Sequence, residues 1–305
     1  MDELNKKLIL KAAAGLGNQM FMYANAYSLA KEIGYDLHVD NTSGYFQKKN
    51  TTHYRKYALD IFNISAKNAI FKDRYDNYVT HNLKKIKKLI NHFQKRKSFL
   101  TDPKINLKKT HYKKIDFLFS NKIYQEGYFE SEKYFVNYKN DLLNEFTIKK
   151  ELIKKDNKFI KLLNETNSVS IHIRRDRFIE PGIFFNKGSE PKKDIKLEDV
   201  ISYTKRGISF FREKLQNPKF FIWSNNFSEL DKVFNKDEFV FVKNNDFIND
   251  FHLFSHAKHF ILGPSSFHWW GAWLNKNKNK ICIRPPDHLN PSDNKDFWPM
   301  SWTIV

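Results

Sequence analysis

The chain has 305 residues, of which 41% are hydrophobic and 16% aromatic, a composition that excludes an intrinsically disordered protein. Its formal net charge of +19 is compatible with an anionic partner, such as nucleic acid, a membrane surface or a phosphorylated substrate, but the interpretation we prefer is mostly solvated lysine. The single cysteine, Cys282, excludes an internal disulfide and a thiolate metal site, which fits a reducing compartment.

No membrane-spanning or targeting segment is predicted. No apolar run approaches the roughly 20 residues that a transmembrane helix requires. The chain opens on MDELNKK, which does not resemble the start of a signal peptide. We therefore expect a cytoplasmic protein.

The first segment predicts a strand, a turn, a helix and a second strand. Residues 8–13 form an apolar run, and Gly15 and Gly17 are expected to allow a tight turn with positive φ. Gly34 is expected to end the helix, and a strand follows at 37–39. The helix is predicted from residues at helical spacing, which are Met20, Tyr23, Tyr27 and Ala30.

Residues 83–97 predict a basic amphipathic helix. Its apolar residues share one face, and lysines cover the rest. One interpretation is docking on an anionic membrane. The interpretation we prefer is a surface helix that packs its apolar stripe on the core. The stripe consists of Leu83, Ile86, Ile90 and Phe93.

The remaining pattern is that of an α/β protein. A strand and turn are predicted at 121–129, and helices at 132–148 and 149–167, the second bridging two halves. Strands then alternate with helices, which argues for parallel sheets. A long loop at 178–196 has the character of a substrate lid. Together with the length, this predicts two domains, 1–150 and 151–305. The later strands are expected at 169–174, 219–224, 238–242, 259–262 and 280–284.

The segment SVSIHIRRDRF (168–178) ends a buried strand on charged residues. Ligands of α/β proteins bind at such strand ends. Arg174 presents a guanidinium that binds phosphate bidentately. His172 is expected on the same face of the strand as Arg174, where it either holds a sugar or phosphate oxygen or is a hydrogen-bonded core histidine.

A second anion site is predicted in KHFILGPSSFHWWGAWLNK (258–276). A short strand is followed by a turn at Gly263 and Pro264, and then by a helix with Ser265 or Ser266 as its N-cap. The N-terminus of a helix offers free N–H groups and a partial positive charge. A parallel sheet can bring this end beside Arg174, and the two together are expected to hold a diphosphate without a metal.

Other cofactor sites are not predicted. The sequence has no Asp-x-Asp and no Walker P-loop. The stretch GLGNQ (15–19) is only part of a dinucleotide fingerprint, which disfavours NAD.

Four motifs in order resemble those of the glycosyltransferase family 11 α-1,2-fucosyltransferases. More loosely, they resemble those of the wider fucosyltransferase superfamily with a His-x-Arg motif. They are AGLGNQMFMYANAYSLA (14–30), HIRR (172–175), DFHLFSHAKHFILGPSSFHWWGAWLN (250–275) and FWPMSW (297–302).

The resemblance implies an α/β fold of the GT-B type, with two Rossmann-like lobes and the nucleotide-sugar in the cleft between them. Residues 1–150 are then the acceptor-side lobe and 151–305 the GDP-sugar lobe, with a C-terminal segment that packs back on the first. The implied reaction inverts GDP-β-L-fucose to an α-1,2-fucoside of a galactoside hydroxyl. It uses no metal and no cofactor. The implied acceptor is an oligosaccharide or glycolipid precursor of a bacterial surface glycan.

The resemblance also implies residue roles. Arg174 grips the β-phosphate of the leaving GDP, and His172 lies near the donor. Asp250, with Phe251, is expected to read guanine. Asp176 is the candidate catalytic base, from its position alone. The full set of implied donor-binding residues is Gly17, Asn18, Gln19, Arg174, Asp250, Ser265, Ser266 and Phe267.

Departures from the family pattern leave alternatives open. Asp176 and Arg177 stand where the family has Gly and Asp, and WSNN (223–226) replaces Ser-Asp-Asp. Pro264 and His268 replace an Asn and a Ser. The sugar is therefore either fucose or another GDP-linked deoxy sugar. The alternatives of other classes are a sulfotransferase-like enzyme and a non-catalytic binder of nucleic acid or anionic surfaces. Within the enzyme hypothesis no nucleic-acid partner is expected.

Overall fold

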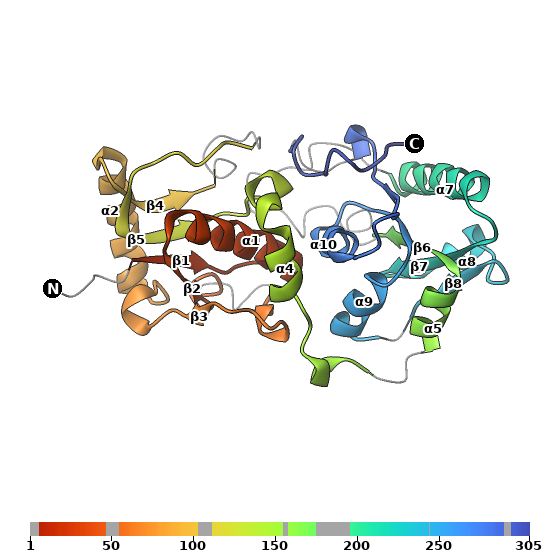
Figure 1. Ribbon diagram of the computed structural model, residues 1–305, viewed down its shortest axis with the longest axis horizontal. Helices are drawn as coiled ribbons and strands as arrows, with labels where there is room; N and C mark the ends of the chain where they lie inside the picture. Colours follow the sequence, from red (N-terminus) through yellow and green to blue (C-terminus); the bar gives the residue numbers. More distant parts are fainter. Residues whose placement is uncertain are drawn as a thin grey trace. The chain divides into compact units, whose positions relative to one another are not determined.

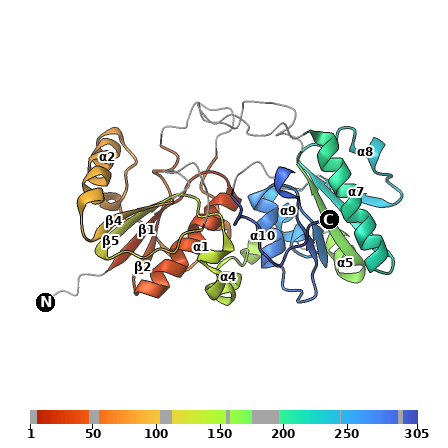
Figure 2. The same ribbon diagram turned by 90° about the horizontal axis from the view of Figure 1, so that it is seen from above.

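The computed structural model describes residues 6–46, 55–102, 112–154, 158–174, 196–243, 245–289 and 294–305. The chain divides into two compact units, each built around a parallel sheet with helices (Figures 1 and 2). The first unit comprises the described residues of Met1–Thr147 with Asn294–Phe297, and the second those of Ile148–Asp293 with Trp298–Val305. The expected α/β class with parallel strands is confirmed.

The sheet of the first unit has the order β3-β2-β1-β5-β4, and every pairing is parallel. Its strands are β1 (Lys7–Lys11), β2 (Asp36–Asp40), β3 (Lys67–Asn68), β4 (Lys97–Thr101) and β5 (Phe119–Glu126). Its helices are α1 (Leu16–Ile33), α2 (Tyr78–Phe93) and α4 (Lys139–Glu145), with short 3₁₀ turns at Leu59–Ile61, Phe71–Asp73, Glu132–Tyr134 and Val136–Tyr138.

The predicted start of the chain is confirmed except for its turn. Gly34 ends α1 in the left-handed region at φ 67°, and its N–H donates to Ala30 O, as a glycine C-cap does. The residue with positive φ before α1 is Ala14, at 61°. Gly15 has φ −82°, and Gly17 lies in the first turn of the helix. The turn therefore takes its left-handed residue from an alanine, and the prediction of positive φ at the two glycines was wrong.

Two helical predictions of this region were also wrong in extent. The predicted helix 132–148 is two 3₁₀ turns followed by α4 alone, because Phe135 adopts a non-helical φ of −146° between the turns. The predicted helix 149–167 is a 3₁₀ turn at Lys150–Leu152 and, beyond residues 155–157, the helix α5 (Lys158–Glu165). Helical spacing of apolar residues did not reveal these breaks.

Helix α2 differs from the predicted helix 83–97 in both its bounds and its orientation. It begins after Asn77, whose side chain forms a capping box with Thr80, and Lys97 already belongs to β4. Its apolar side chains are exposed, whereas Lys84 is buried. The prediction that the apolar stripe packs on the core was therefore wrong.

The sheet of the second unit has the order β10-β9-β6-β7-β8, again with parallel pairings. Its strands are β6 (Asn167–Ile173), β7 (Pro218–Ser224), β8 (Phe239–Phe241), β9 (His259–Ile261) and β10 (Cys282–Ile283). Besides α5, its helices are α7 (Leu197–Lys214), α8 (Leu230–Val233), α9 (Phe247–Phe254) and α10 (Ser266–Leu274), with a 3₁₀ turn at Asp287–Leu289. The five strands expected after residue 168 are all present, some of them shorter than predicted.

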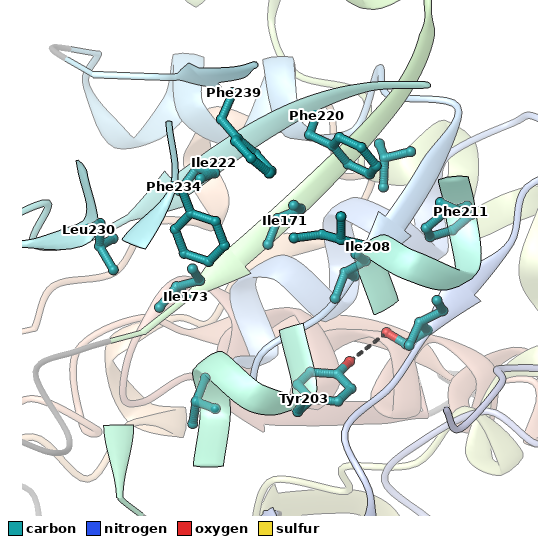
Figure 3. Packing of buried hydrophobic residues seen from close by; sticks show 14 of the residues in the cluster. Ile171, Ile173, Tyr203, Ile208, Phe211, Phe220, Ile222, Leu230, Phe234 and Phe239 are labelled. Atoms are coloured by element: carbon teal, nitrogen blue, oxygen red, sulfur yellow. Dashed lines mark hydrogen bonds between the residues drawn. The ribbon is translucent and has the colours of Figure 1, made fainter. Parts of the chain in front are cut away.

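The two faces of β6 differ in chemistry. Ile171 and Ile173 point into an apolar core with side chains of α7, including Ile208 (Figure 3). On the other face Ser170 is buried and accepts a hydrogen bond from Trp223 Nε1 at 2.9 Å. The alternation of apolar and polar residues in the sequence therefore separates two buried faces, of which only one is purely apolar.

Candidate functional site

The strand order of the second unit creates a switch point between β6 and β9. The chain adds β7 and β8 on one side of β6, then returns to add β9 and β10 on the other. Ligands of such doubly wound sheets bind at the carboxyl ends of the strands beside this point. Arg174 directly follows β6, and Ser265 and Ser266 follow β9 by a short turn. The structure thus brings together the two segments that were expected to hold a diphosphate.

His172 and His268 form a stacked pair at this switch point. Their ring centroids are 3.5 Å apart and the ring planes differ by 17°. Burial lowers the pKa of His268 well below its usual value, and the neighbouring His172 and Arg174 lower it further. His268 is therefore neutral near pH 7, and Arg174 lies close enough to act on it electrostatically. The sequence revealed His268 only as a departure from the family pattern.

Gly263 allows β9 to approach the histidine pair. A Cβ atom added at this position would lie 2.7 Å from the backbone oxygen of His172 and 2.8 Å from its Nδ1. Both distances are shorter than real Cβ contacts, and the backbone oxygen has no freedom to move aside. A side chain here would force the turn before α10 away from the end of β6.

Replacing Gly263 by Ala is expected to destabilise the protein by about 1–3 kcal/mol, as overpacking does, and to abolish most turnover. Urea unfolding and an activity assay measure the two effects. Gly15→Ala is the matched control for stability, because among the described residues its Cβ would meet only Arg55 Nε, at 4.0 Å, and its φ of −82° suits alanine. Equal losses of stability in both variants would refute the steric explanation.

The N-terminus of α10 is the element of this site that the sequence predicted to bind an anion. Ser265 occupies the N-cap position, but its side chain makes no capping hydrogen bond. The Ser265 hydroxyl lies instead 3.3 Å from His268 Nδ1. Ser266 is the first helical residue and is half-buried. The predicted N-cap position is therefore right, whereas the expected capping hydrogen bond is absent from this described segment.

Tyr203 of α7 fixes the ends of the strands that precede the site. No sequence pattern predicted this role. Its ring is buried, and its hydroxyl lies 3.0 Å from Leu262 O and 3.1 Å from Ile283 O (Figure 3). It thereby holds the ends of β9 and β10 together, just before the turn that leads to α10. No local pattern distinguishes Tyr203 from other apolar residues on α7.

Asp250 lies on α9 and is half-buried. Burial raises its pKa to about 6, with a smaller contribution from Asp246, while the Asn245 side chain opposes the shift. Its Oδ1 atom is buried and has no hydrogen-bond partner among the described residues. Phe251 is also buried and packs edge-on against Phe267, which leaves its ring no open face for stacking on guanine.

Three of the predicted donor-binding residues, Gly17, Asn18 and Gln19, belong to the first unit. Gln19 is buried; its Nε2 donates to Ala14 O and Lys56 O, and its Oε1 accepts from Ala58 N, all at 2.9 Å. Its amide therefore ties the turn before α1 to the chain at 56–58. Asn18 is half-buried in the first turn of α1.

Asp176, the candidate base, lies outside the described residues, as do Arg175 and positions 178–195 of the predicted lid. Across the described part of the chain, no cluster of three or more His, Cys, Asp and Glu side chains is placed to hold a metal ion. No helix in the same part is long and apolar enough to cross a membrane.

Comparisons with known proteins agree with the motifs. A family model for glycosyl transferase family 11 matches residues 6–303. An alpha-1,2-colitosyltransferase of Escherichia coli is 28% identical over 96% of both chains. The O-antigen biosynthesis glycosyltransferase WbnK of Escherichia coli is 26% identical over 90% of this chain and 92% of its own. Among solved structures, the fucosyltransferase NodZ from Bradyrhizobium aligns with a TM-score of 0.48 and 13% identity, over 88% of this chain and 92% of NodZ.

Proposed function

The chain belongs to glycosyl transferase family 11, and from this premise we propose that it transfers L-fucose from GDP-β-L-fucose to a galactoside hydroxyl. The product is an α-1,2 linkage in a precursor of a bacterial surface glycan, made in the cytoplasm. In this proposal the second unit binds the GDP-sugar and the first unit serves the acceptor. The family match favours an enzyme over the non-catalytic binder of anions.

The main observation behind the proposal is that Arg174 and the N-terminus of α10 follow the adjacent strands β6 and β9, at the switch point of the second sheet. In glycosyl transfer the acceptor oxygen forms a bond to the anomeric carbon while the bond to the β-phosphate breaks, and its electrons leave on the diphosphate. Negative charge grows there in the transition state. Fixed donors aimed at this charge lower the barrier more than they strengthen ground-state binding. A guanidinium and a helix N-terminus are such donors.

The other predicted residues have supporting roles in this proposal. Asp250, with its buried Oδ1, is suited to accept hydrogen bonds from the N1–H and amino group of guanine. His172 is buried and stacked on His268, which fixes the orientation of its ring, and its proposed role is to orient a sugar or phosphate oxygen. Asp176 is proposed, from its position alone, to take the proton of the acceptor hydroxyl. A dissociative route without a strong base is the alternative.

A second candidate sugar is colitose, another deoxy sugar. It is favoured by the 28% identity with an alpha-1,2-colitosyltransferase over nearly the whole chain. The departures in the family motifs at Asp176 and His268 also leave room for a different sugar. The nucleotide and the chemistry of the leaving group are the same in both candidates.

Donor hydrolysis without an acceptor tests the proposal. The panel consists of GDP-fucose, GDP-colitose, GDP-mannose, UDP-galactose and CMP-sialic acid. We expect hydrolysis of the GDP-linked deoxy sugars. Whichever of GDP-fucose and GDP-colitose is hydrolysed faster identifies the transferred sugar. Faster turnover of the UDP- or CMP-sugar would overturn the nucleotide assignment. Inhibition by 3′-phosphoadenosine 5′-phosphate but not by GDP would favour the sulfotransferase-like alternative.

Metal independence is a further expectation. Because Arg174 and the N-terminus of α10 supply the positive charge, EDTA is expected to leave the rate of sugar transfer unchanged. The measurement compares initial rates with and without chelator, and after Mn²⁺ or Mg²⁺ is added back. Loss of activity that either ion restores would show that the protein donors are not sufficient.

A further inference from the structure

Helix α2 presents the opposite face to the one expected of a surface helix. Its inward positions, from Asn77 through Thr80, Lys84 and Lys88 to Asn91, are all polar. Its outward positions form an apolar surface that we call the α2 stripe. Phe93 is 81% exposed, Leu89 68% and Ile86 57%. The α2 stripe consists of Val79, Leu83, Ile86, Leu89, Ile90 and Phe93.

The orientation of α2 is set by a buried carboxylate. Glu126, at the end of β5, accepts from Lys84 Nζ at 2.7 Å, from Lys88 Nζ at 2.8 Å and from Lys11 Nζ at 3.2 Å. Burial alone would raise the pKa of Glu126, but these lysines lower it to about 2. The carboxylate is therefore charged, and it holds the basic face of α2 against the sheet.

The C-terminal end of α2 is held in the same orientation by a separate contact. Asn91 Oδ1 accepts from the backbone N–H groups of Ser98 at 2.7 Å and Phe99 at 3.0 Å, and its Nδ2 donates to Phe99 O at 3.1 Å. Both halves of the helix are thus attached through polar groups, and α2 lies beside β4 in both views (Figures 1 and 2). The α2 stripe points outward because of these bonds.

Positive charge borders the α2 stripe. Lys85 lies along one side of it and Lys87 along the other, and Lys95 and Arg96 follow beyond its C-terminal end; all four are exposed. The helix itself contains no acidic residue. An exposed apolar stripe flanked on each side by a lysine is the pattern of a helix that lies in the interface of a membrane.

We propose that the α2 stripe docks on a bilayer containing anionic phospholipid, with its apolar side chains among the acyl chains and the flanking lysines at the head groups. A second copy of this chain is a poorer partner. A symmetric pairing of two stripes would bring Lys85 and Lys87 of both copies together, and like charges in an interface are unfavourable. The proposal does not depend on which sugar is transferred.

The test is flotation with vesicles of phosphatidylcholine alone and vesicles that also contain phosphatidylglycerol, with no donor present. The wild-type chain is expected to float with the anionic vesicles. Ile86→Ser with Phe93→Ser removes apolar area that the bilayer would bury and should weaken vesicle binding by about tenfold or more. Lys85→Glu with Lys87→Glu should weaken it by about 25-fold or more, since each lysine near an anionic surface contributes about fivefold.

Matched controls lie far from α2 in the sequence. Met300→Ser removes a side chain that is 91% exposed, and Lys276→Glu with Lys278→Glu reverses two exposed charges. These variants are expected to bind vesicles nearly as the wild type does, and all variants should keep the wild-type unfolding midpoint because the changed side chains are exposed.

Three outcomes would overturn the proposal. Equal flotation with both kinds of vesicle would exclude the anionic head group. Equal losses of vesicle binding in the α2 variants and the control variants would show that binding depends only on the net charge of the protein. A dimer in solution that the Ile86→Ser and Phe93→Ser pair disrupts, without any vesicle binding by the wild type, would assign the α2 stripe to self-association.

Discussion

Replacing Arg174 by Lys is expected to lower kcat by about 10²-fold or more, in analogy with the loss of one oxyanion donor. Lysine keeps the positive charge but loses the planar fork that binds phosphate bidentately. The charge that Arg174 meets grows in the transition state, so the KM for the donor should rise far less than kcat falls. Steady-state kinetics with the GDP-sugar measure both quantities.

Two other arginines provide the comparison. Arg175→Lys should be milder or act mainly on stability, because the alternation of the sequence predicts that Arg175 and His172 lie on opposite faces. Arg212→Lys alters an exposed ion pair with Glu238 on the surface of the same unit and is expected to leave kcat unchanged. Normal turnover by Arg174→Lys together with an inactive Arg175→Lys would place the diphosphate on the other side of the strand.

Replacing Glu126 by Gln is expected to destabilise the protein by about 3–5 kcal/mol, the usual cost of leaving a buried ion without its partner. Lys84, which is only 5% exposed, would then lose the carboxylate with which it pairs among the described residues. The free energy of unfolding in urea measures the effect. Glu229→Gln, which breaks an exposed pair with Lys232, should change it by less than about 1 kcal/mol.

Because of Glu126, we also expect the stability of the folded protein to depend on pH in acid. Because the pKa of Glu126 is about 2 in the folded protein and 4.5 in its ordinary state, its contribution to stability is complete above pH 4.5. This contribution is lost as the pH falls from 4.5 towards 2. Glu126→Gln should unfold with a weaker dependence on pH in that window.

A second-site change distinguishes a buried charge from general damage. Adding Lys84→Met to Glu126→Gln removes the uncompensated charge and should recover most of the lost stability. If the double variant were no more stable than Glu126→Gln alone, the loss would not come from Lys84. An unchanged midpoint in Glu126→Gln would mean that the lysine cluster does not hold α2.

Local patterns were sufficient to predict most of the second unit. Alternation of apolar and polar residues in β6 predicted a strand that ends at Arg174, and the run FIL followed by Gly-Pro-Ser-Ser predicted β9, its turn and the start of α10. Short-range periodicity and turn residues encode such elements because each depends on neighbours in the chain. Two of the four family motifs, 172–175 and 250–275, lie on or beside these same elements, so the reaction class was also readable from the sequence.

Contacts between distant residues decided the rest. Periodicity identified α2 as amphipathic but could not say which face would be buried, because that depended on Glu126, 42 residues away from Lys84. The stack of His172 on His268 and the clamp of Tyr203 on β9 and β10 likewise join segments far apart in the chain. By itself the sequence determined most of the strands, the family and the segments that are expected to bind an anion. Only the tertiary structure decided how the segments meet and which face of α2 meets water, since a buried charge must be neutralised by whatever the fold brings beside it.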